Sequence, residues 1–557
     1  MERRVVLAIV LAVAVLFLTP RLFPPARRTT PPLPANTLAD TTQQAAVVPD
    51  TAPRTQRGVE AIAATDSQAV RIDTTTITTP QVTYGFRNLG AELESVQLPE
   101  FKALNTGSGT VRLDSRWDPL LSYSIVLPND TIPLQRTVFV GAVDAGGRSI
   151  EYRGRAKHLA VAVRYTPTGD KYLTRVTGEI TDTTGRPAGD SAYLVITLPR
   201  GLESFEANTI EDARGATVAF KQATRSASLI RLGSVDPNEQ KIEPGPLSWV
   251  AFKSKYFILG LIEPDSTTPF AELQVQGLAR PDKNTPLARI AVVKQVRAGK
   301  FGFDIYTGPQ KWDVMRDVGR DFGSANAYGG WLQPIVQPFA TIVMRVLLWM
   351  HRGFNLHYGW VLLLFGVIVR VAMWPLNQTA MKSSMRMQEL QPLLSEVQKR
   401  YKSDPQRMSA ETMKLYKDHG MSPSSPLAGC FPILLSMPVL FALFFVFQST
   451  IEFRGVPFLW LHDISVKDFL YIAPLLMGGS MFLTSWLSMR SSPPNPQTRM
   501  MTYILPVMMT VLLANMASGL NLYWAAQNIA SLPQQWLIAR ERARKRQQAV
   551  KPAVKPA

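Results

Sequence analysis

Cysteine is almost missing from this chain of 557 residues. The single one, Cys430, lies in an apolar run, so no disulfide can form within the chain and no zinc site can be built from thiolates. Histidine is scarce as well, with five residues, and no cluster of metal-ligating side chains is evident. We therefore expect neither a metal nor another cofactor.

Aspartate, glutamate and histidine are also missing from the long apolar runs of the C-terminal half. Proton-coupled pumps need titratable groups at depth in the membrane, so this absence argues against ion-coupled transport. No catalytic constellation and no motif for binding specific DNA or RNA stands out. The formal net charge is +18 at pH 7, but the basic clusters flank apolar runs, which is typical of positive-inside topology rather than of a nucleic-acid surface.

Six apolar segments are expected to span a membrane, which makes the chain a polytopic α-helical membrane protein. They are residues 5–18, 358–376, 426–448, 469–489, 500–516 and 520–539. The first follows Arg3 and Arg4 and could be a signal peptide or an uncleaved anchor. Because no small-x-small cleavage site follows it, we expect an anchor with its N-terminus inside.

Two polar regions separate the first segment from the others. Residues 24–70 are rich in Pro, Thr, Ala and Gln without periodicity, which predicts a disordered linker. Residues 71–310 hold short alternating runs rich in β-branched residues, punctuated by Gly, Pro, Asn and Asp, which predicts a large antiparallel β sandwich. The one histidine of this region, His158, and its scattered carboxylates favour a binding or spacing domain; an enzyme acting on envelope sugars is the alternative.

Residues 331–350 are long and apolar enough to span, but they carry Gln333, Gln337, Arg345 and two prolines. If this segment spanned, the loop 377–425, with eight Lys/Arg against five Asp/Glu, would lie outside together with the Arg-rich end of the chain. The positive-inside rule opposes that arrangement. We therefore predict an amphipathic interfacial helix here, which leaves the loop in the cytoplasm.

The loop 378–420 has helical periodicity in two stretches, with a break at Ser403-Asp404-Pro405, which predicts a cytoplasmic helical hairpin. Its stripes include Met381, Met385, Leu390, Met408 and Tyr416. They either pack on each other or, because methionine adapts to varied surfaces, capture partners.

Arg370 is the only Lys, Arg, Asp, Glu or His in any of the six segments. A charge in a membrane span costs about 2.5–3.5 kcal/mol on insertion scales. Since Leu376 ends the segment six residues later, the side chain either snorkels toward the interface or faces a polar cavity. With no carboxylate in the segments to pair with it, water or a visiting ligand must solvate it.

The last segment carries neutral polar residues on one face. They follow one another at steps of three or four residues: Asn521, Trp524, Asn528, Ser531 and Gln535. Such a stripe either forms hydrogen bonds between helices or, beside Arg370, lines a wet concavity.

Six motifs in residues 355–540 resemble the YidC-type membrane protein insertases of Gram-negative bacteria. They are Ile368-Val-Arg370-Val-Ala-Met-Trp374-Pro375-Leu376, Met387-Gln-Glu-Leu-Gln-Pro392, Lys414-Leu-Tyr-Lys417, Pro426-Leu-Ala-Gly-Cys430-Phe-Pro432, Leu461-His-Asp-Ile464 and Ser518-Gly-Leu-Asn-Leu-Tyr-Trp524. The β region matches that family in placement and size rather than in motif.

The resemblance implies a hydrophilic groove that is open to the cytoplasm and to lipid, with Arg370 as its positive charge. The groove residues implied or predicted are Arg370, Gly366, Ser436, Tyr523, Trp524, Asn528, Ser531 and Gln535. Three of them depart from the family's commoner residues: Trp524 replaces tyrosine, Gly366 replaces threonine, and Ser436 stands where glutamine is frequent. The resemblance implies that the residues at positions 524 and 366 contact the substrate. Gly366 cannot form a side-chain hydrogen bond in such a contact. The β region is expected to be a β-supersandwich, similar to sugar-binding sandwiches.

The resemblance further implies an insertase and chaperone of the inner membrane, without enzymatic activity. Its expected partners are nascent membrane proteins, the Sec translocon with its accessory subunits, the lipid bilayer and, through the hairpin and basic tail, the ribosome. The runner-up function is a transporter or channel for anionic solutes.

Five of the six spans would form the insertase core. The expected domains are an anchor (1–23), a linker (24–70), a periplasmic β sandwich (71–310), a connector with the interfacial helix (311–357), the membrane core (358–540) and a basic cytoplasmic tail (541–557).

Overall fold

The computed structural model describes residues 72–550, apart from short gaps. The gaps are 106–108, 170–171, 190, 265–267, 327, 329–331, 376–377, 379–389, 391–392, 403, 420–430 and 491–495. The expected anchor and linker, residues 1–70, therefore lie outside the described residues. The part of the chain that the structure describes belongs to one compact unit.

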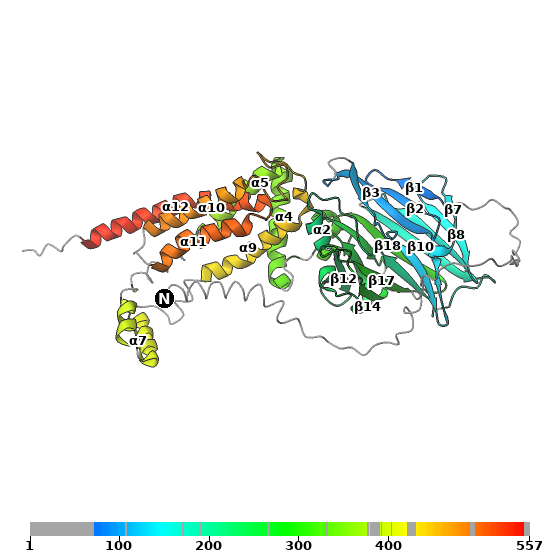
Figure 1. The fold of residues 1–557 in the computed structure, drawn as a ribbon, viewed down its shortest axis with the longest axis horizontal. Coiled ribbons are helices and arrows are strands. Elements are labelled where there is room, and N and C mark those ends of the chain that lie inside the picture. Colours follow the sequence, from blue (N-terminus) through cyan, green and yellow to red (C-terminus); the bar gives the residue numbers. More distant parts are fainter. Residues whose placement is uncertain are drawn as a thin grey trace, which may run out of the picture. The chain divides into compact units, whose positions relative to one another are not determined.

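Strands β1–β18 form the first half of the described chain, and all their pairings are antiparallel (Figure 1). One sheet has the order β1-β2-β3-β4. The other has the order β6-β5-β11-β17-β16-β14-β15-β18-β10-β9-β8-β7, and β12 joins it through β14 and carries β13. The strands are β1 (Thr74–Thr78), β2 (Thr83–Arg87), β3 (Glu92–Lys102), β4 (Thr110–Leu113), β5 (Ser122–Leu127), β6 (Asp130–Pro133), β7 (Val140–Val143), β8 (Ile150–Ala156), β9 (Leu159–Pro167), β10 (Leu173–Asp182), β11 (Tyr193–Leu198), β12 (Thr217–Gln222), β13 (Ser228–Arg231), β14 (Gln240–Lys253), β15 (Phe257–Ile262), β16 (Phe270–Gly277), β17 (Ala288–Gln295) and β18 (Lys300–Pro309).

The core of this region lies where the two sheets face each other. Phe86 on β2 contacts Tyr165 on β9, with ring centroids 4.6 Å apart. The hydroxyl of Tyr165 donates a hydrogen bond of 2.7 Å to the carbonyl of Ala91 and lies 2.7 Å from the hydroxyl of Tyr123. The hydroxyls of Tyr165 and Tyr123 are therefore both paired, as buried polar groups usually are. The predicted β sandwich is confirmed.

Helices dominate the rest of the described chain. The α-helices are α2 (Thr209–Arg214, within the β region), α3 (Trp312–Asp317), α4 (Gln333–Phe354), α5 (Tyr358–Ala372), α7 (Pro405–Asp418), α9 (Phe431–Ser449), α10 (Ile472–Arg490), α11 (Pro496–Leu513) and α12 (Ser518–Val550). Short 3-10 turns are η1 (Leu134–Arg136), η2 (Leu232–Ser234), η3 (Phe322–Ala325) and η5 (Ile451–Phe453). Helix α12 packs mainly against α10 and α5, α11 packs against α10, and α4 packs against α9.

Two of the described helices are long and apolar enough to cross a membrane, namely α4 and residues Ile472–Met489 of α10. Residues Tyr358–Ala372, Pro438–Ser449 and Thr502–Leu513 are apolar but shorter. The predicted number of six spans is therefore not confirmed.

Helix α4 passes the length criterion for a span although the charge pattern predicts that it lies in the interface. Its solvent-exposed face alternates apolar and basic side chains: Ile335, Ile342, Arg345, Trp349 and Arg352. Such a mixed face suits an interface better than a lipid core. Figure 1 also shows α4 running across the direction of α5 and α9. The interfacial position stays a prediction that these features support.

The predicted break within the loop 378–420 is present. Residues 393–400 are helical, and α7 begins at Pro405. The carboxylate of Asp404 accepts a hydrogen bond of 3.0 Å from the backbone N–H of Arg407, and proline is well tolerated at the first helical position. Leu390 is buried, whereas Met408 and Tyr416 are half-buried; Met381 and Met385 lie outside the described residues.

Helix α12 does not end at residue 540, where the sequence analysis ends the membrane core. It continues to Val550. The added residues are mainly Ala, Arg, Lys and Gln, all good helix formers, and no proline occurs among them.

Candidate functional site

Arg370 lies near the C-terminal end of α5 and faces α12. Its Nη2 donates a hydrogen bond of 3.0 Å to Oε1 of Gln534, which is almost fully buried. Nε2 of Gln534 lies 3.4 Å from Oε1 of Gln378, so the contact continues into a second amide. The guanidinium thus donates to one neutral amide, that of Gln534, which in turn donates to a second amide beyond the C-terminal end of α5.

The charge of Arg370 has no carboxylate partner within the described residues. Its Nε is buried and finds no hydrogen-bond acceptor there. Leaving a buried charged donor unpaired costs more than leaving a neutral one, which is why such groups are rare unless they have a function. The site therefore presents a positive charge with donor capacity to spare.

Gly366, one turn before Arg370, is a point of close approach between α5 and α12. A Cβ built at Gly366 would lie 3.0 Å from the carbonyl oxygen of Tyr523 and 3.4 Å from Cβ of Ala526. Small residues at such positions let two helix backbones come close together. A larger side chain at this position would require α12 to shift by a few tenths of an ångström. Gly366 is buried here, so the structure places it in the helix contact rather than on an open surface.

The predicted polar stripe of α12 is largely engaged in hydrogen bonds within the protein. Nδ2 of Asn528 donates 3.1 Å to the hydroxyl of Ser480 on α10, and Nδ2 of Asn521 donates 3.1 Å to the carbonyl of Leu513. The hydroxyl of Ser531 donates 2.6 Å to the carbonyl of Asn528. For these three residues the geometry favours hydrogen bonding within and between packed helices over the lining of a hydrated groove.

The remaining predicted groove residues divide between core and partly open positions. Tyr523 is only 1% exposed, and its ring lies 5.9 Å from that of Phe365 and 5.8 Å from that of Phe447. It therefore belongs to the apolar core, which corrects the expectation of an open groove position. Trp524 and Gln535 are half-buried. The side chain of Ser436 lies outside the described residues.

Gln534 and Gln378 complete the Arg370 site, and the sequence analysis missed both. Tyr523, Gln527 and Gln534 are spaced four and seven residues apart, so they share the face of α12 that meets α5. The predicted stripe followed the neighbouring face instead. The repeat of Gln527 and Gln534, seven residues apart, was the signal that could have found this face.

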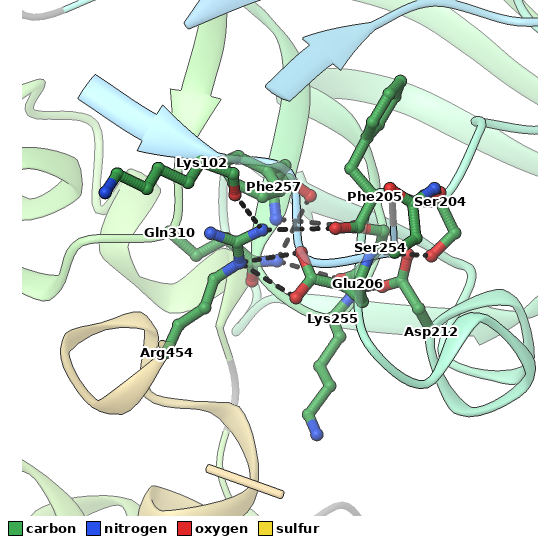
Figure 2. A network of polar contacts seen from close by, with 11 residues as sticks. Lys102, Ser204, Phe205, Glu206, Asp212, Ser254, Lys255, Phe257, Gln310 and Arg454 are labelled. Carbon is green, nitrogen blue, oxygen red and sulfur yellow. Dashed lines mark hydrogen bonds and ion pairs between the residues drawn. The ribbon is translucent and has the colours of Figure 1, made fainter. Parts of the chain in front are cut away.

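A second buried polar contact joins the helical half to the β sandwich (Figure 2). Arg454, just after η5, and Glu206 are 4% and 6% exposed. Nε of Arg454 donates to both carboxylate oxygens, at 2.8 and 2.9 Å, and Nη2 donates 2.9 Å to the carbonyl of Lys102. Burial raises the pKa of Glu206 to about 7, and the charge of Arg454 opposes this shift. Nothing in the sequence pattern pairs these two residues.

Glu452 in η5 is half-buried and lacks such a partner within the described residues. Its Oε2 is buried without a hydrogen bond within the described residues. Burial raises the pKa of Glu452 to about 7, and backbone hydrogen bonds oppose that shift only in part.

Glu452→Gln should make the stability of the protein less dependent on pH. In the folded state the pKa of the carboxyl, about 7, lies above its ordinary value of 4.5. Its contribution to the free energy of unfolding is therefore fully present below pH 4.5 and lost as the pH rises through about 7. The loss amounts to about 3 kcal/mol, since each pKa unit corresponds to about 1.4 kcal/mol. Unfolding temperatures of the detergent-solubilised wild type should fall over this pH range, and those of the variant should fall less.

The matched control for this prediction is Glu179→Gln, which removes an exposed carboxylate from β10. Its unfolding temperature should follow the wild type at every pH. If Glu452→Gln and Glu179→Gln show the same pH profile, the buried carboxyl does not titrate between these limits.

Comparison with known proteins covers both halves of the chain. The family model described as 60Kd inner membrane protein matches residues 349–546, and the model of the YidC periplasmic domain matches residues 74–342. The membrane protein insertase YidC of Chlorobium phaeovibrioides is 31% identical over 411 residues, which cover 70% of this chain and 68% of the relative. The insertase YidC of an Anaeromyxobacter species is 30% identical over 397 residues, which cover 71% and 69%.

Solved structures give weaker similarities. An active YidC insertase with its first transmembrane domain resolved is 16% identical, with a TM-score of 0.34, covering 84% of this chain and 94% of its own. A galactose mutarotase-like protein from Lactobacillus casei is 11% identical, with a TM-score of 0.28, covering 42% and 100%. At these TM-scores neither adds to the assignment.

Proposed function

The chain belongs to the YidC family of membrane protein insertases, and from that premise we propose that the Arg370 site carries the polar flank of a nascent membrane segment. YidC insertases act on nascent membrane proteins in the membrane and are not a class of enzymes. The observation that carries the proposal is a half-buried guanidinium whose one direct hydrogen bond within the described residues goes to a neutral amide, that of Gln534.

The proposed mechanism lowers the cost of moving polar groups into the membrane. Moving a polar or charged flank out of water without new hydrogen-bond partners costs several kcal/mol of free energy. Arg370 offers unused donors, and Gln534 holds its guanidinium in one direction. An acidic flank would gain charge-assisted hydrogen bonds there, which are stronger than neutral ones.

The apolar part of the substrate moves into lipid beside the same helices. The outer faces of α10 and α11 are apolar and exposed, as at Leu475, Val507 and Val511. Transfer of apolar surface from water to lipid is favourable by about 25 cal/mol per Å² and supplies the driving force. The mechanism therefore uses neither a nucleotide nor a metal.

The direction of the helices supports the proposed six-span topology. Leu362, Gly366 and Arg370 on α5 meet Gly519, Tyr523 and Gln534 on α12 in the same order. The two helices therefore run parallel. The six-span topology requires this, because both helices would cross the membrane from the outside to the inside. We place the β sandwich in the periplasm of a bacterium, the core in its inner membrane, and the loop 378–420 and the basic tail in the cytoplasm.

The proposed partners are the nascent chain, the lipid bilayer and, at the cytoplasmic hairpin and tail, the ribosome; the Sec translocon is a further proposed partner. Specific nucleic acid and a cofactor have no place in this proposal. A transporter or channel for anionic solutes is not favoured, because the relatives reported above are named as insertases.

A photocrosslinker at position 524 should trap a nascent transmembrane segment in ribosome-bound insertion intermediates. Trp524 is half-buried at the edge of the helical core, on the same helix as Gln534. Its control is position 529, where Ile529 is 49% exposed on another face of α12. The control is the more accessible position, so several times stronger crosslinking at 524 would reflect substrate contact rather than exposure. Equal crosslinking at both would contradict a groove on this side of α12.

A further inference from the structure

A hollow of about 450 Å³ lies between α3 and the second half of α4, away from Arg370. Its lining combines three arginines with two tryptophans and one carboxylate: Arg316, Arg345, Arg352, Trp312, Trp349 and Asp313. A volume of this size is in the range of small-molecule sites. The insertase function uses none of these residues.

The lining carries an excess of positive charge. Arg352 forms an ion pair with Asp313. The lining contains no other carboxylate to neutralise the remaining two arginines. Arg316 lies 3.5 Å from Asp317, a long contact between two exposed side chains that contributes little. Arg345 has neither an ion pair nor a hydrogen bond in the described part of the chain. The hollow can therefore accept an anion.

The ring of Trp312 orients the guanidinium groups of Arg316 and Arg345. The guanidinium of Arg316 lies 4.8 Å from the ring centroid of Trp312, and that of Arg345 lies 5.8 Å from the same ring. Stacked guanidinium groups keep their edges free for bidentate hydrogen bonds, which match the oxygens of a phosphate. Arginine at such a site suits a planar or tetrahedral oxyanion better than lysine does.

The rim of the hollow is apolar on the side of α4. Trp349 and Phe354 are both more than half exposed, with ring centroids 5.2 Å apart. Ile342 is exposed about two turns before Trp349. Exposed tryptophan beside arginine is typical of the level of lipid headgroups. A soluble anion would use the arginines but would leave these rings in water.

We propose that the hollow between α3 and α4 binds the phosphate of an anionic phospholipid, with the acyl chains along the exposed rings of α4. The ligand chemistry is a phosphodiester that is attached to an apolar body. The inference rests on the proposed interfacial position of α4 and goes beyond insertion of substrates, since it assigns a resident lipid to the outer side of the protein.

The test is native mass spectrometry of the full chain in detergent, titrated with phosphatidylglycerol or with phosphatidylcholine. The wild type should retain phosphatidylglycerol more strongly. The double variant Arg316→Gln/Arg345→Gln should weaken this retention by about tenfold, because charge-assisted hydrogen bonds are lost. Arg289→Gln removes an exposed arginine of the β sandwich and should change nothing. Arg316→Lys/Arg345→Lys keeps the charge and should restore part of the binding.

Each contrary outcome overturns the assignment. Equal retention of both lipids by the wild type would show that the hollow is not a site for anionic phospholipid. Full retention of phosphatidylglycerol by the double glutamine variant would show the same. Displacement of phosphatidylglycerol by an equal concentration of inorganic phosphate would assign the hollow to a soluble anion. The unfolding temperature of the glutamine variant without phosphatidylglycerol should equal that of the wild type, which separates lost binding from lost folding. Because insertion is not measured, this result and the insertase function can fail independently.

Discussion

Arg370→Ala should reduce the insertion of substrates whose translocated tails carry Asp or Glu by about tenfold or more, since a hydrogen bond to a charged group contributes about 1.5–3 kcal/mol. Substrates with neutral tails should lose much less. Arg370→Lys should retain much of the function, because it keeps the charge although it loses the planar donor fork that meets Gln534.

The measurement is complementation of a depletion strain, scored by protease protection of model substrates that differ only in tail charge. Gln534→Leu should give an intermediate defect, because Arg370 stays charged but loses the residue that directs it. Arg540→Ala, at an exposed position on the same helix, is the control. An equal defect for acidic and neutral tails would mean that the arginine is needed for structure.

Arg454→Ala should destabilise the protein by about 3–5 kcal/mol, which is the usual cost of breaking a buried ion pair by removing one partner. The carboxylate of Glu206 would lose both its charge partner and two short hydrogen bonds, at 2.8 and 2.9 Å. The carbonyl of Lys102 would lose a donor as well. The unfolding temperature of the purified chain and the resistance of its β sandwich to protease should both fall.

The double variant Arg454→Met/Glu206→Leu separates the missing contact from the stranded charge. Replacement of both partners by apolar side chains of similar volume is often nearly neutral, so much of the stability should return. Arg116→Ala is the matched single control, because Arg116 pairs with Glu203 at an exposed position. Loss of an exposed ion pair should change the free energy of unfolding very little. If Arg454→Ala and Arg116→Ala have equal effects, the buried pair does not hold the two regions together.

Local features of this fold were predictable because short stretches of sequence determine them. Alternating β-branched residues define the strands, and Asp404 with Pro405 defines the start of α7 through one cap. Arg370 could be singled out because its charge contradicts its apolar surroundings. None of these inferences requires knowledge of how distant elements pack.

The rest depends on such packing. Gln534 is the neighbour of Arg370 only because α12 turns one particular face to α5, and the choice between Gln534 and Gln535 is a rotation of about 100°. Arg454 and Glu206 are 248 positions apart, and no local pattern relates them. Tyr523 was misplaced for the same reason, since a tyrosine suits a groove and an aromatic core equally well.

The close approach at Gly366 determines which side of the protein can yield when a substrate enters. With the carbonyl of Tyr523 only 3.0 Å from where a Cβ would stand, α5 and α12 have no space left to slide together and would expose their polar contact if they parted. Helix α11 packs against α10 and has exposed apolar residues such as Val507 and Val511. Widening should therefore occur by displacement of α11 into lipid. Arg370 then keeps its position. Substrate segments of different widths contact the same pair of helices, α5 and α12, while α11 moves by a distance that depends on the size of the segment.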